Sequence, residues 1–394
     1  MADLLQGIRV LDFGRYIAGP FCAALLADLG ADVVRVEKVG GGEDRFLMPV
    51  TDGGDGGFYL QMNRGKRGMT LDVRRREGQY VLQRLVATAD VVVANLPDAA
   101  LKNLGLDYAS LSALKPDIIL TSVSAFGSGG PLSHKLGFDA IGQAMSGIMY
   151  LSGHSGEPTK AYCPYVDFST ALVATVGTLA ALMARTETGQ GQEVRASLLS
   201  TALTIANGVL IEQAMTAPNR ISSLNRSQTQ APSDAYRTRD GWIIVQCIGQ
   251  SLFKRWVTLM NELRWLEDPR FADDQTRGDH GEVISERMAA WCAARSTNDA
   301  LSALEEARIP AGPVLSPQQV LEDAHVKTAA FLQTLSFPGA TRDAPVAATP
   351  FTLSITPAHV RHRAPTLGEH TNSILEDLGY SAPAVAELRS RGVI

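Results

Sequence analysis

The chain has 394 residues, a formal net charge of −5 at pH 7, 45% hydrophobic residues and 20% charged residues. These values are ordinary for a globular protein, and they exclude disorder, collagen and a coiled coil as the main architecture. The mild acidity argues against a nucleic-acid-binding protein, and the length suggests two domains or one large domain with an insertion.

The first 38 residues predict a strand, a helix and a second strand. IRVLDF (8–13) is a short apolar run closed by Gly14, and residues 20–29 carry apolar side chains at helical spacing. DVVRVE (32–37) alternates like a strand. This βαβ pattern favours a parallel strand pair with a right-handed crossover.

The same alternation continues along the chain and predicts a doubly wound α/β sheet. The expected elements are a helix at 77–88, a strand at 90–94, a short helix at 111–114 and a strand at 117–122. Two long segments rich in Ala and Gly, 138–149 and 170–185, then predict packed helices.

Composition changes near Pro218, and the following segment predicts a second, smaller core. Residues 219–234 are polar without periodicity, as in a linker or an active-site loop. Residues 235–247 predict a hairpin around Asp240-Gly241, and all four tryptophans lie between 242 and 291. From Pro345 the chain is extended, with a helix at 372–378.

Cysteine usage and segment lengths predict a soluble, cytoplasmic protein. The four cysteines are far apart and form no metal-binding spacing, which is typical of a reducing compartment. The N-terminus lacks the pattern of a signal peptide. The longest apolar segment, Ala171 to Met183, is too short to span a bilayer and predicts a buried helix.

Glycine-rich and basic segments are candidates for nucleotide binding. The first turn, DFGRYIAGP, is not GxGxxG, and GGGED (40–44) lacks the Lys-Ser/Thr of a P-loop, so NAD and ATP are disfavoured. NRGKR (63–67), with Arg35 and Lys38 on the preceding predicted strand segment not far off, is typical either of a solvated turn or of a phosphate-binding edge.

Asp167 stands in PYVDFSTAL (164–172), just before an apolar helix. A carboxylate there is typical of a helix N-cap, and in an apolar setting it is also typical of a nucleophile. The residues alone leave both interpretations open. His134, His154 and His370 are isolated and show neither triad nor metal spacing.

Taken together, these stretches identify a family resemblance. The whole chain resembles the class III coenzyme A transferases, the family of formyl-CoA transferase and carnitine CoA-transferase, which includes the α-methylacyl-CoA racemases. The matching stretches run in the family's order from end to end. They are 7–20, 29–44, 63–73, 89–108, the Asp167 segment, 188–198, 235–242, 309–316 and 364–371.

The resemblance implies a Rossmann-like large domain, a smaller α+β domain and an interlocked homodimer. It divides the chain into 1–218 as the first part of the large domain, 219–330 as linker and small domain, and 331–394 as a tail that returns to the large domain.

The resemblance also implies the chemistry. Asp167 would attack an acyl-CoA thioester and then carry CoA as an aspartyl thioester, before CoA passes to a small di- or hydroxy-carboxylate. Coenzyme A is then a substrate, and no permanently bound cofactor is expected. Partners would be small carboxylates and a second copy of the chain, with no nucleic acid and no membrane.

The CoA site carries over residue by residue. Tyr16, Ile17 and Ala18 match the segment along pantetheine, Asn95 and Leu96 match the pair flanking CoA, and Lys38, Lys66 and Arg67 match basic positions near the phosphates. Lys102 and Asn103 occupy a stretch where relatives place an Arg, and Lys135 lies within one position of a family Lys.

Two departures concern the substrate. Racemases place a His where this chain has Phe138, although Asp139 follows it, so a 2-methylacyl-CoA racemase or epimerase is the alternative to a transferase. Residues 219–234 lack the glycine run of formyl-CoA transferase, and Arg220, Arg226 and Gln230 are candidates to hold a distal carboxylate. A CoA-binding protein without catalysis and a nucleotide-dependent oxidoreductase are further alternatives.

Overall fold

The structure is a computed structural model and describes residues 3–394. It divides the chain into two compact units. The first is Met1–Ser146, Tyr162–Ala206 and His325–Ile394, and the second is Gly147–Ala161 and Asn207–Ala324. Each unit is described by itself.

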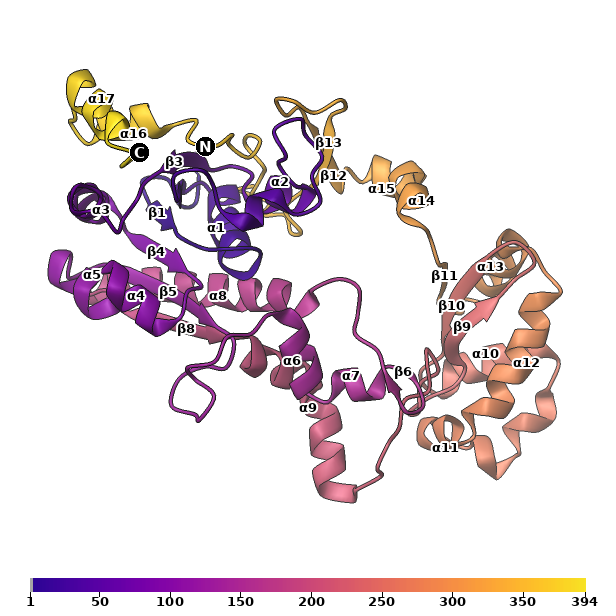
Figure 1. Ribbon diagram of the computed structural model, residues 1–394. Coiled ribbons are helices and arrows are strands. Elements are labelled where there is room, and N and C mark those ends of the chain that lie inside the picture. Colours follow the sequence, from indigo (N-terminus) through magenta and orange to yellow (C-terminus); the bar gives the residue numbers. More distant parts are fainter. Residues whose placement is uncertain (1–2) are drawn as a thin grey trace. The chain divides into compact units, whose positions relative to one another are not determined.

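The first unit is built on a six-stranded parallel sheet with strand order β3-β2-β1-β4-β5-β8 (Figure 1). The strands are β1 (Arg9–Asp12), β2 (Asp32–Glu37), β3 (Arg67–Thr70), β4 (Val91–Ala94), β5 (Ile119–Ser124) and β8 (Glu193–Ser197). The predicted α/β alternation with a parallel sheet is therefore confirmed, and β3 and β8 are strands that the sequence pattern did not reveal.

Helices cover both faces of this sheet, which explains the continuous apolar runs of its strands. Val10, Val33 and Val91 pack with α1 (Ala18–Asp28) and α8 (Tyr165–Thr188) on one face. Their chain neighbours Leu11, Val34 and Val92 pack on the other face. The helices there are α3 (Arg76–Thr88), α4 (Asp98–Leu104), α5 (Tyr108–Leu114), α16 (Thr371–Asp377) and α17 (Ala382–Ser390).

Small side chains let α1 and α8 approach each other closely. Cys22 and Ala23 of α1 and Ala171 and Ala174 of α8 are fully buried in one cluster. Helix α8 is longer than predicted, and it ends at Gly189, whose φ of 67° suits glycine.

Two helices, α8 and α9 (Leu198–Thr216), are long and apolar enough to cross a membrane by length and composition. The sequence-based expectation that this segment is too short to span a bilayer considered only Ala171 to Met183, which is shorter than α8. Length and composition are weak evidence, because core helices pass the same test, and 44% of the most apolar part of α8 is buried inside the protein.

The predicted helix over 138–149 is interrupted. It forms α6 (Asp139–Met145) and α7 (Ile148–Leu151), separated at Gly147, whose φ is 87°. A residue with a side chain rarely adopts this backbone conformation, so glycine ends the first helix here. Of these two helices α6 belongs to the first unit and α7 to the second. The remaining elements of the first unit are η1 (Glu43–Phe46), α2 (Gly57–Met62), β12 (Leu332–Leu335) and β13 (Ala344–Ala347), and α15 (Ala324–Thr328) begins at the boundary.

The second unit has its own antiparallel sheet and aromatic core. The predicted hairpin is confirmed as β9 (Ser233–Arg237) paired with β10 (Trp242–Gln246), which also pairs with β11 (Ala311–Pro313). Its other elements are β6 (Gly153–His154), β7 (Glu157–Pro158), α10 (Gln250–Met260), η2 (Leu263–Leu266), η3 (Pro269–Phe271), α11 (Asp274–Asp279), α12 (Gly281–Ala293), α13 (Thr297–Glu306) and α14 (Pro317–Glu322).

Three tryptophans contribute to the core of the second unit, and the fourth does not. Trp256 and Trp291 are buried, and Trp265 packs against them. Trp242 is 46% exposed, because alternate residues of β10 face solvent. The second, smaller core that the tryptophan-rich segment predicted is therefore present, and Trp242 lies outside it.

The unit boundaries differ from the predicted divisions at 218/219 and 330/331. Residues 147–161 and 207–218 fall in the second unit, and residues 325–330 fall in the first. The physical reason for the first difference is non-local hydrogen bonding: Leu224 donates its N–H to Gly153 O at 2.9 Å, and Ser222 Oγ donates to His154 O at 2.7 Å. Such pairing is not visible in local sequence patterns.

Candidate active site

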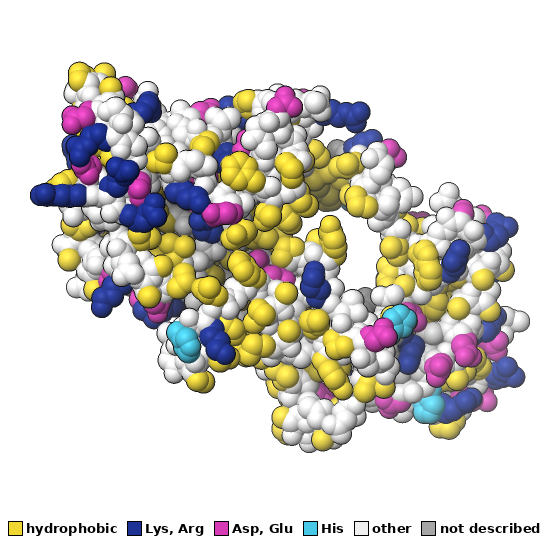
Figure 2. All heavy atoms as spheres, viewed as in Figure 1, with side chains coloured by type: hydrophobic (Ala, Val, Ile, Leu, Met, Phe, Trp, Pro, Cys, Tyr) yellow, Lys and Arg dark blue, Asp and Glu magenta, His cyan; other side chains and the backbone are white. Residues whose placement is uncertain are grey.

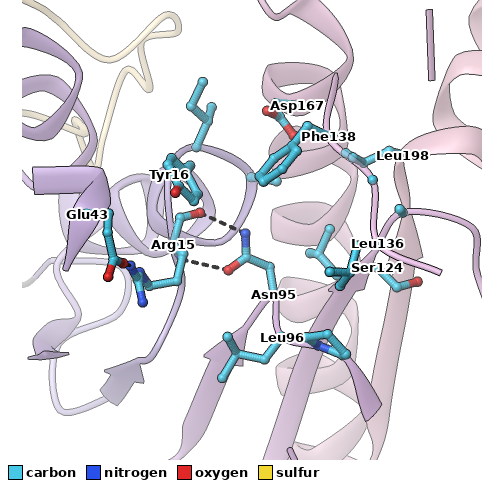
Figure 3. A pocket seen from close by; sticks show the side chains of 16 residues that line it. Arg15, Tyr16, Glu43, Asn95, Leu96, Ser124, Leu136, Phe138, Asp167 and Leu198 are labelled. Atoms are coloured by element: carbon cyan, nitrogen blue, oxygen red, sulfur yellow. Dashed lines mark hydrogen bonds and ion pairs between the residues drawn. The ribbon is translucent and has the colours of Figure 1, made fainter. Parts of the chain in front are cut away.

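A cavity of about 330 Å³ opens at the carboxyl ends of the central strands of the first unit (Figure 3). Its walls come from Arg15–Ala18 after β1, Asn95–Pro97 after β4 and Val123–Ala125 at the end of β5. The strand order reverses between β1 and β4, so the loops that follow these strands diverge and leave a crevice. Glu43, Leu136–Phe138, Asp167 and Leu198 complete the lining.

The turn after β1 is fixed by side chains on both of its flanks. Asp12 Oδ1 accepts the N–H of Gly14 at 2.7 Å. Asn95 accepts the N–H of Arg15 at 2.6 Å and donates to its carbonyl at 2.8 Å. A Cβ at Gly19 would lie 3.0 Å from the Cα of Gly14, so this turn and the start of α1 need close backbone approach. The turn is held rigidly, and Tyr16 adopts a φ of 62° within it.

A buried ion pair lies beneath this turn. Lys66 Nζ donates to Asp12 Oδ2 at 2.7 Å, to Pro20 O at 2.8 Å and to Asn63 Oδ1 at 2.9 Å. Both charged side chains are fully buried, and burial lowers the pKa of Lys66 to about 8. All three donor positions of the ammonium are used, so its hydrogen-bonding capacity is satisfied inside the protein.

Asp167 is the third residue of α8, and it does not cap its own helix. The exposed N–H groups of the first turn go to another carboxylate: Asp139 Oδ1 accepts the N–H of Val166 at 2.7 Å and of Asp167 at 3.1 Å. Gln143 donates to the other oxygen of Asp139 at 2.5 Å. This arrangement disfavours the N-cap interpretation of Asp167 and leaves its carboxylate facing the cavity.

The setting of Asp167 favours the neutral acid. Burial raises its pKa first, and the like charge of Asp139 adds to this, so that the pKa rises from 3.8 to about 7. Among the described residues, neither a hydrogen bond nor a cation offsets these two effects at Asp167. A carboxylate with a raised pKa in a pocket is typical of a reacting group.

Aromatic side chains line the way to Asp167. The rings of Tyr16 and Phe138 meet edge to face at 5.5 Å, and Phe138 is 61% exposed. Figure 3 shows Phe138 next to Asp167, with Tyr16 farther along the cavity. Within residues 3–394 no group of three or more His, Cys, Asp or Glu side chains could hold a metal ion.

The structure brings together many of the predicted site residues. Tyr16, Ile17, Ala18, Asn95, Leu96, Phe138 and Asp167 all line this one cavity. Lys38 lines a smaller cavity of about 100 Å³, which shares Arg15 and Leu96 with the first. Arg15, Glu43 and Leu198 were not expected. The only sequence signal for Arg15 was its place in the first turn.

Other predicted site residues lie elsewhere. Lys66 is buried beneath the turn, and Arg67 pairs with Asp32 at 2.7 Å and Asp377 at 3.1 Å. These placements give no support to a phosphate contact by either side chain, because both are engaged within the protein. Lys102, Asn103 and Lys135 are exposed and do not line the cavity, and Arg226 belongs to the second unit.

Comparison with known proteins gives a consistent result over the whole chain. A model of CoA-transferase family III matches residues 5–371. The chain is 33% identical over 399 residues to the succinyl-CoA–D-citramalate CoA-transferase of Chloroflexus aurantiacus, covering 99% of this chain and 98% of that protein. It is also 33% identical over 392 residues to the succinate–glutarate CoA-transferase of Agrobacterium fabrum, with 95% of each chain covered.

A solved structure agrees at the level of the fold. The crystal structure of a CAIB/BAIF family protein from Brucella suis superposes with a TM-score of 0.83 at 30% identity. The match covers 96% of this chain and 100% of that chain. The parallel sheet and the helices around it are therefore shared with a protein described as a member of that family.

The buried position of Lys66 generates a first prediction. Lys66→Met leaves the Asp12 carboxylate buried without its principal partner, and we expect the free energy of unfolding to fall by about 3 kcal/mol. Lys38→Met, at a half-exposed side chain, should have little effect on stability. Urea unfolding followed by circular dichroism measures both changes. A Lys66→Met protein as stable as the wild type, with weakened CoA binding, would contradict the structural role.

The raised pKa of Asp167 generates a second prediction. Below about pH 4 the carboxyl group is protonated in both the folded and the unfolded chain, and above pH 7 it is ionised in both, so its burial then destabilises the fold. Asp167→Asn removes the buried charge and with it this destabilisation. We expect the variant to be more stable than the wild type at pH 8, by at most about 4 kcal/mol, and equally stable near pH 4.

Urea unfolding at pH 4, 6 and 8 measures this difference. Asp343→Asn, which also removes one carboxylate but at an exposed position, is the control for a general effect of charge. A wild-type protein that is more stable than Asp167→Asn at pH 8 would show that the carboxylate is stabilised by interactions that the structure does not contain.

Proposed function

The chain belongs to CoA-transferase family III, and from this premise we propose that it moves CoA from an acyl-CoA donor to a small di- or hydroxy-carboxylate through a thioester on Asp167. One observation carries the proposal: a carboxylate with a raised pKa, beside which residues 3–394 place no cation, faces a cavity at the carboxyl ends of β1, β4 and β5.

The proposed reaction begins at the ionised form of Asp167. A carboxylate oxygen attacks the thioester carbonyl of the donor, the C–S bond breaks, and a mixed anhydride and CoA thiolate form. The thiolate then attacks the aspartyl carbonyl, and the donor leaves as its free carboxylate. Asp167 now carries CoA as a thioester.

The second half repeats these steps in reverse order. The acceptor carboxylate attacks the aspartyl thioester, which releases the thiolate and gives a new anhydride. Attack of the thiolate on the acceptor carbonyl forms the product thioester and returns the Asp167 carboxylate. No proton is gained or lost overall, so no separate general base is required. A raised pKa, in contrast to that of an exposed Asp, gives a more basic and hence more nucleophilic carboxylate.

The names of the relatives support a dicarboxylate as the acceptor. One acts on succinyl-CoA and D-citramalate, and another on succinate and glutarate. The cavity beside Asp167 is lined by Phe138 and Leu136, whose apolar surfaces suit a short carbon chain. Arg226 stays a candidate for holding the distal carboxylate.

Covalent trapping tests the mechanism. Incubation with succinyl-CoA, mesaconyl-CoA or acetyl-CoA should add the mass of CoA, less one water, to the wild-type protein, and Asp167→Ala should show no such adduct. Intact-protein mass spectrometry measures the adduct. Its rate of formation should rise with pH through about 7, because only the ionised carboxylate attacks.

Absence of an adduct with every donor would reject the covalent route. Exchange of the Cα proton of 2-methylacyl-CoA for deuterium would then indicate a racemase. The structure offers little support for that alternative, since Phe138 supplies no second base opposite Asp167.

We also propose the homodimer that the family resemblance implies. Leu172, Val176 and Met183 lie on one face of α8 and are 44%, 67% and 71% exposed. Figure 2 shows hydrophobic side chains gathered over the part of the first unit where α6 and α8 lie. Such a face supports burial against another protein surface.

Light scattering after size-exclusion chromatography tests the oligomeric state. The wild type should elute with twice the 42.1 kDa mass of one chain, and Val176→Asp should shift the protein toward the monomer. Tyr80→Asp, at an exposed apolar residue on α3, is the matched control and should leave the mass unchanged. A wild-type protein with the mass of one chain at all concentrations would reject the dimer.

A further inference from the structure

A second cavity, of about 400 Å³, lies beside the one that contains Asp167. It opens at the carboxyl ends of β4, β5 and β8, and all of its lining residues belong to the first unit. Seven of its sixteen lining residues are serine or threonine, and we call it the hydroxyl cavity. The two cavities share Leu96, Pro97, Val123 and Ser124. Figure 3 shows Leu96 and Ser124 on the side of the first cavity away from Asp167.

Two hydroxyl groups of this cavity keep their own hydrogens available. Ser124 Oγ accepts the N–H of Gly127 at 3.1 Å, and Ser197 Oγ accepts the N–H of Ser200 at 3.2 Å. A hydroxyl group that accepts from the backbone still has one hydrogen to donate. Both serines can therefore donate to the acceptor oxygens of a ligand.

Thr201 adds a buried hydroxyl group without a partner. The residue is 6% exposed and lines the cavity, and within residues 3–394 its Oγ1 makes no hydrogen bond. By contrast, the buried Thr170 and Thr178 of α8 each donate to the carbonyl four residues earlier, at 2.7 Å. Burying a hydroxyl group without a hydrogen bond costs free energy, which a ligand that accepts from Thr201 would recover.

One cation and one acid also line the hydroxyl cavity. Arg195 Nη2 lies 2.9 Å from Glu193 Oε2, and the Arg195 side chain is 51% exposed. No other ion-pair partner of this guanidinium lies in the described part of the chain, so most of its five N–H donors stay available. The pKa of Arg195 is raised chiefly by its hydrogen bond to Glu193, and the charge of Asp98 adds to this, so Asp98 lies within electrostatic reach.

A small anion that also carries a hydroxyl group complements this lining. The guanidinium and the O–H groups donate to anionic oxygens. The Asp98 carboxylate can only accept, and a hydroxyl group on the ligand supplies the hydrogen that it needs. Phe126 and Val173 add apolar surface for a short carbon chain. A simple dicarboxylate without a hydroxyl group would meet Asp98 with a like charge and nothing to donate.

We propose that the hydroxyl cavity is a binding site for a small hydroxycarboxylate, which Arg195 and Thr201 hold by its carboxylate and Asp98 by its hydroxyl group. The inference goes beyond the proposed function, because no step of acyl transfer takes place in this cavity. It does not depend on the reactivity of Asp167. The shared wall at Leu96 and Ser124 places the bound hydroxy acid next to the cavity of Asp167.

Isothermal titration calorimetry of the protein without CoA tests the inference, with D-malate, L-malate and succinate as probes. One enantiomer of malate should bind more tightly than succinate, and Asp98→Ala should abolish this preference. Arg195→Met removes a charge-assisted hydrogen bond and should weaken malate binding roughly tenfold or more. Thr201→Val keeps the shape of the side chain and should weaken it roughly threefold. Asp167→Ala should still bind malate.

Arg270→Met is the matched control for Arg195→Met. Arg270 is also 51% exposed and also pairs with an acid two residues earlier, Asp268, at 2.7 Å, but it belongs to the second unit. Its replacement should leave malate affinity unchanged. Far-UV circular dichroism checks that each variant is folded, and Thr201→Val, which changes no charge, tests the same cavity independently of Arg195.

A wild-type protein that binds neither enantiomer of malate would overturn the inference, as would binding that Arg195→Met and Thr201→Val leave unchanged. Malate binding that is lost in Asp167→Ala and retained in Arg195→Met would place the acid at Asp167 and would also overturn it. Inorganic phosphate that binds as tightly as malate would show a general anion site instead. Failure of the proposed function is judged separately, by the CoA adduct of the wild-type protein.

Discussion

The buried Asp12 carboxylate holds together the part of the structure on which the candidate site depends. It ends β1, binds Lys66 from 54 residues farther along the chain and accepts the N–H of Gly14 at the start of the turn. Burying a charge is costly unless it is paired and hydrogen-bonded, and here both conditions are met. The turn that carries Arg15 to Ala18 can therefore keep one conformation, and Asn95 clamps it from the neighbouring strand.

Asp167, the proposed nucleophile, is supported in a different way. Asp139 satisfies the N–H groups at the start of α8, a task that the residues of α8 itself leave undone. This frees the Asp167 side chain from the helix and places a like charge near it, which adds to the effect of burial on its pKa. The two carboxylates thus have separate duties: one maintains the backbone, and the other faces the cavity in an energetically unfavourable setting, as functional groups often do.

Periodicity and turn residues were sufficient to predict the regular parts of the fold. The strands at 32–37 and 90–94, the helix at 77–88 and the hairpin near Asp240 are strongly patterned and agree closely with the observed elements. The strands β3 and β8 were not predicted, because polar residues and a glycine interrupt their apolar pattern. These residues are Arg67, Gly68, Glu193 and Arg195. At the site, the sequence does not show which of the two lysines Lys38 and Lys66 is buried. The difference depends on Asp12, which is distant in the sequence: it pairs with the buried Lys66, whereas Lys38 is exposed. The boundary at Gly147 likewise depends on hydrogen bonds across the chain.

The cap of α8 has a consequence for evolution. Because Asp139 and not Asp167 closes the end of the helix, residue 167 can change without unwinding α8. The scaffold and the proposed reacting group are separable, so mutation can change the side chain at that position while the protein still folds. Selection can then modify the walls of the cavity, such as Phe138, independently of the sheet beneath them.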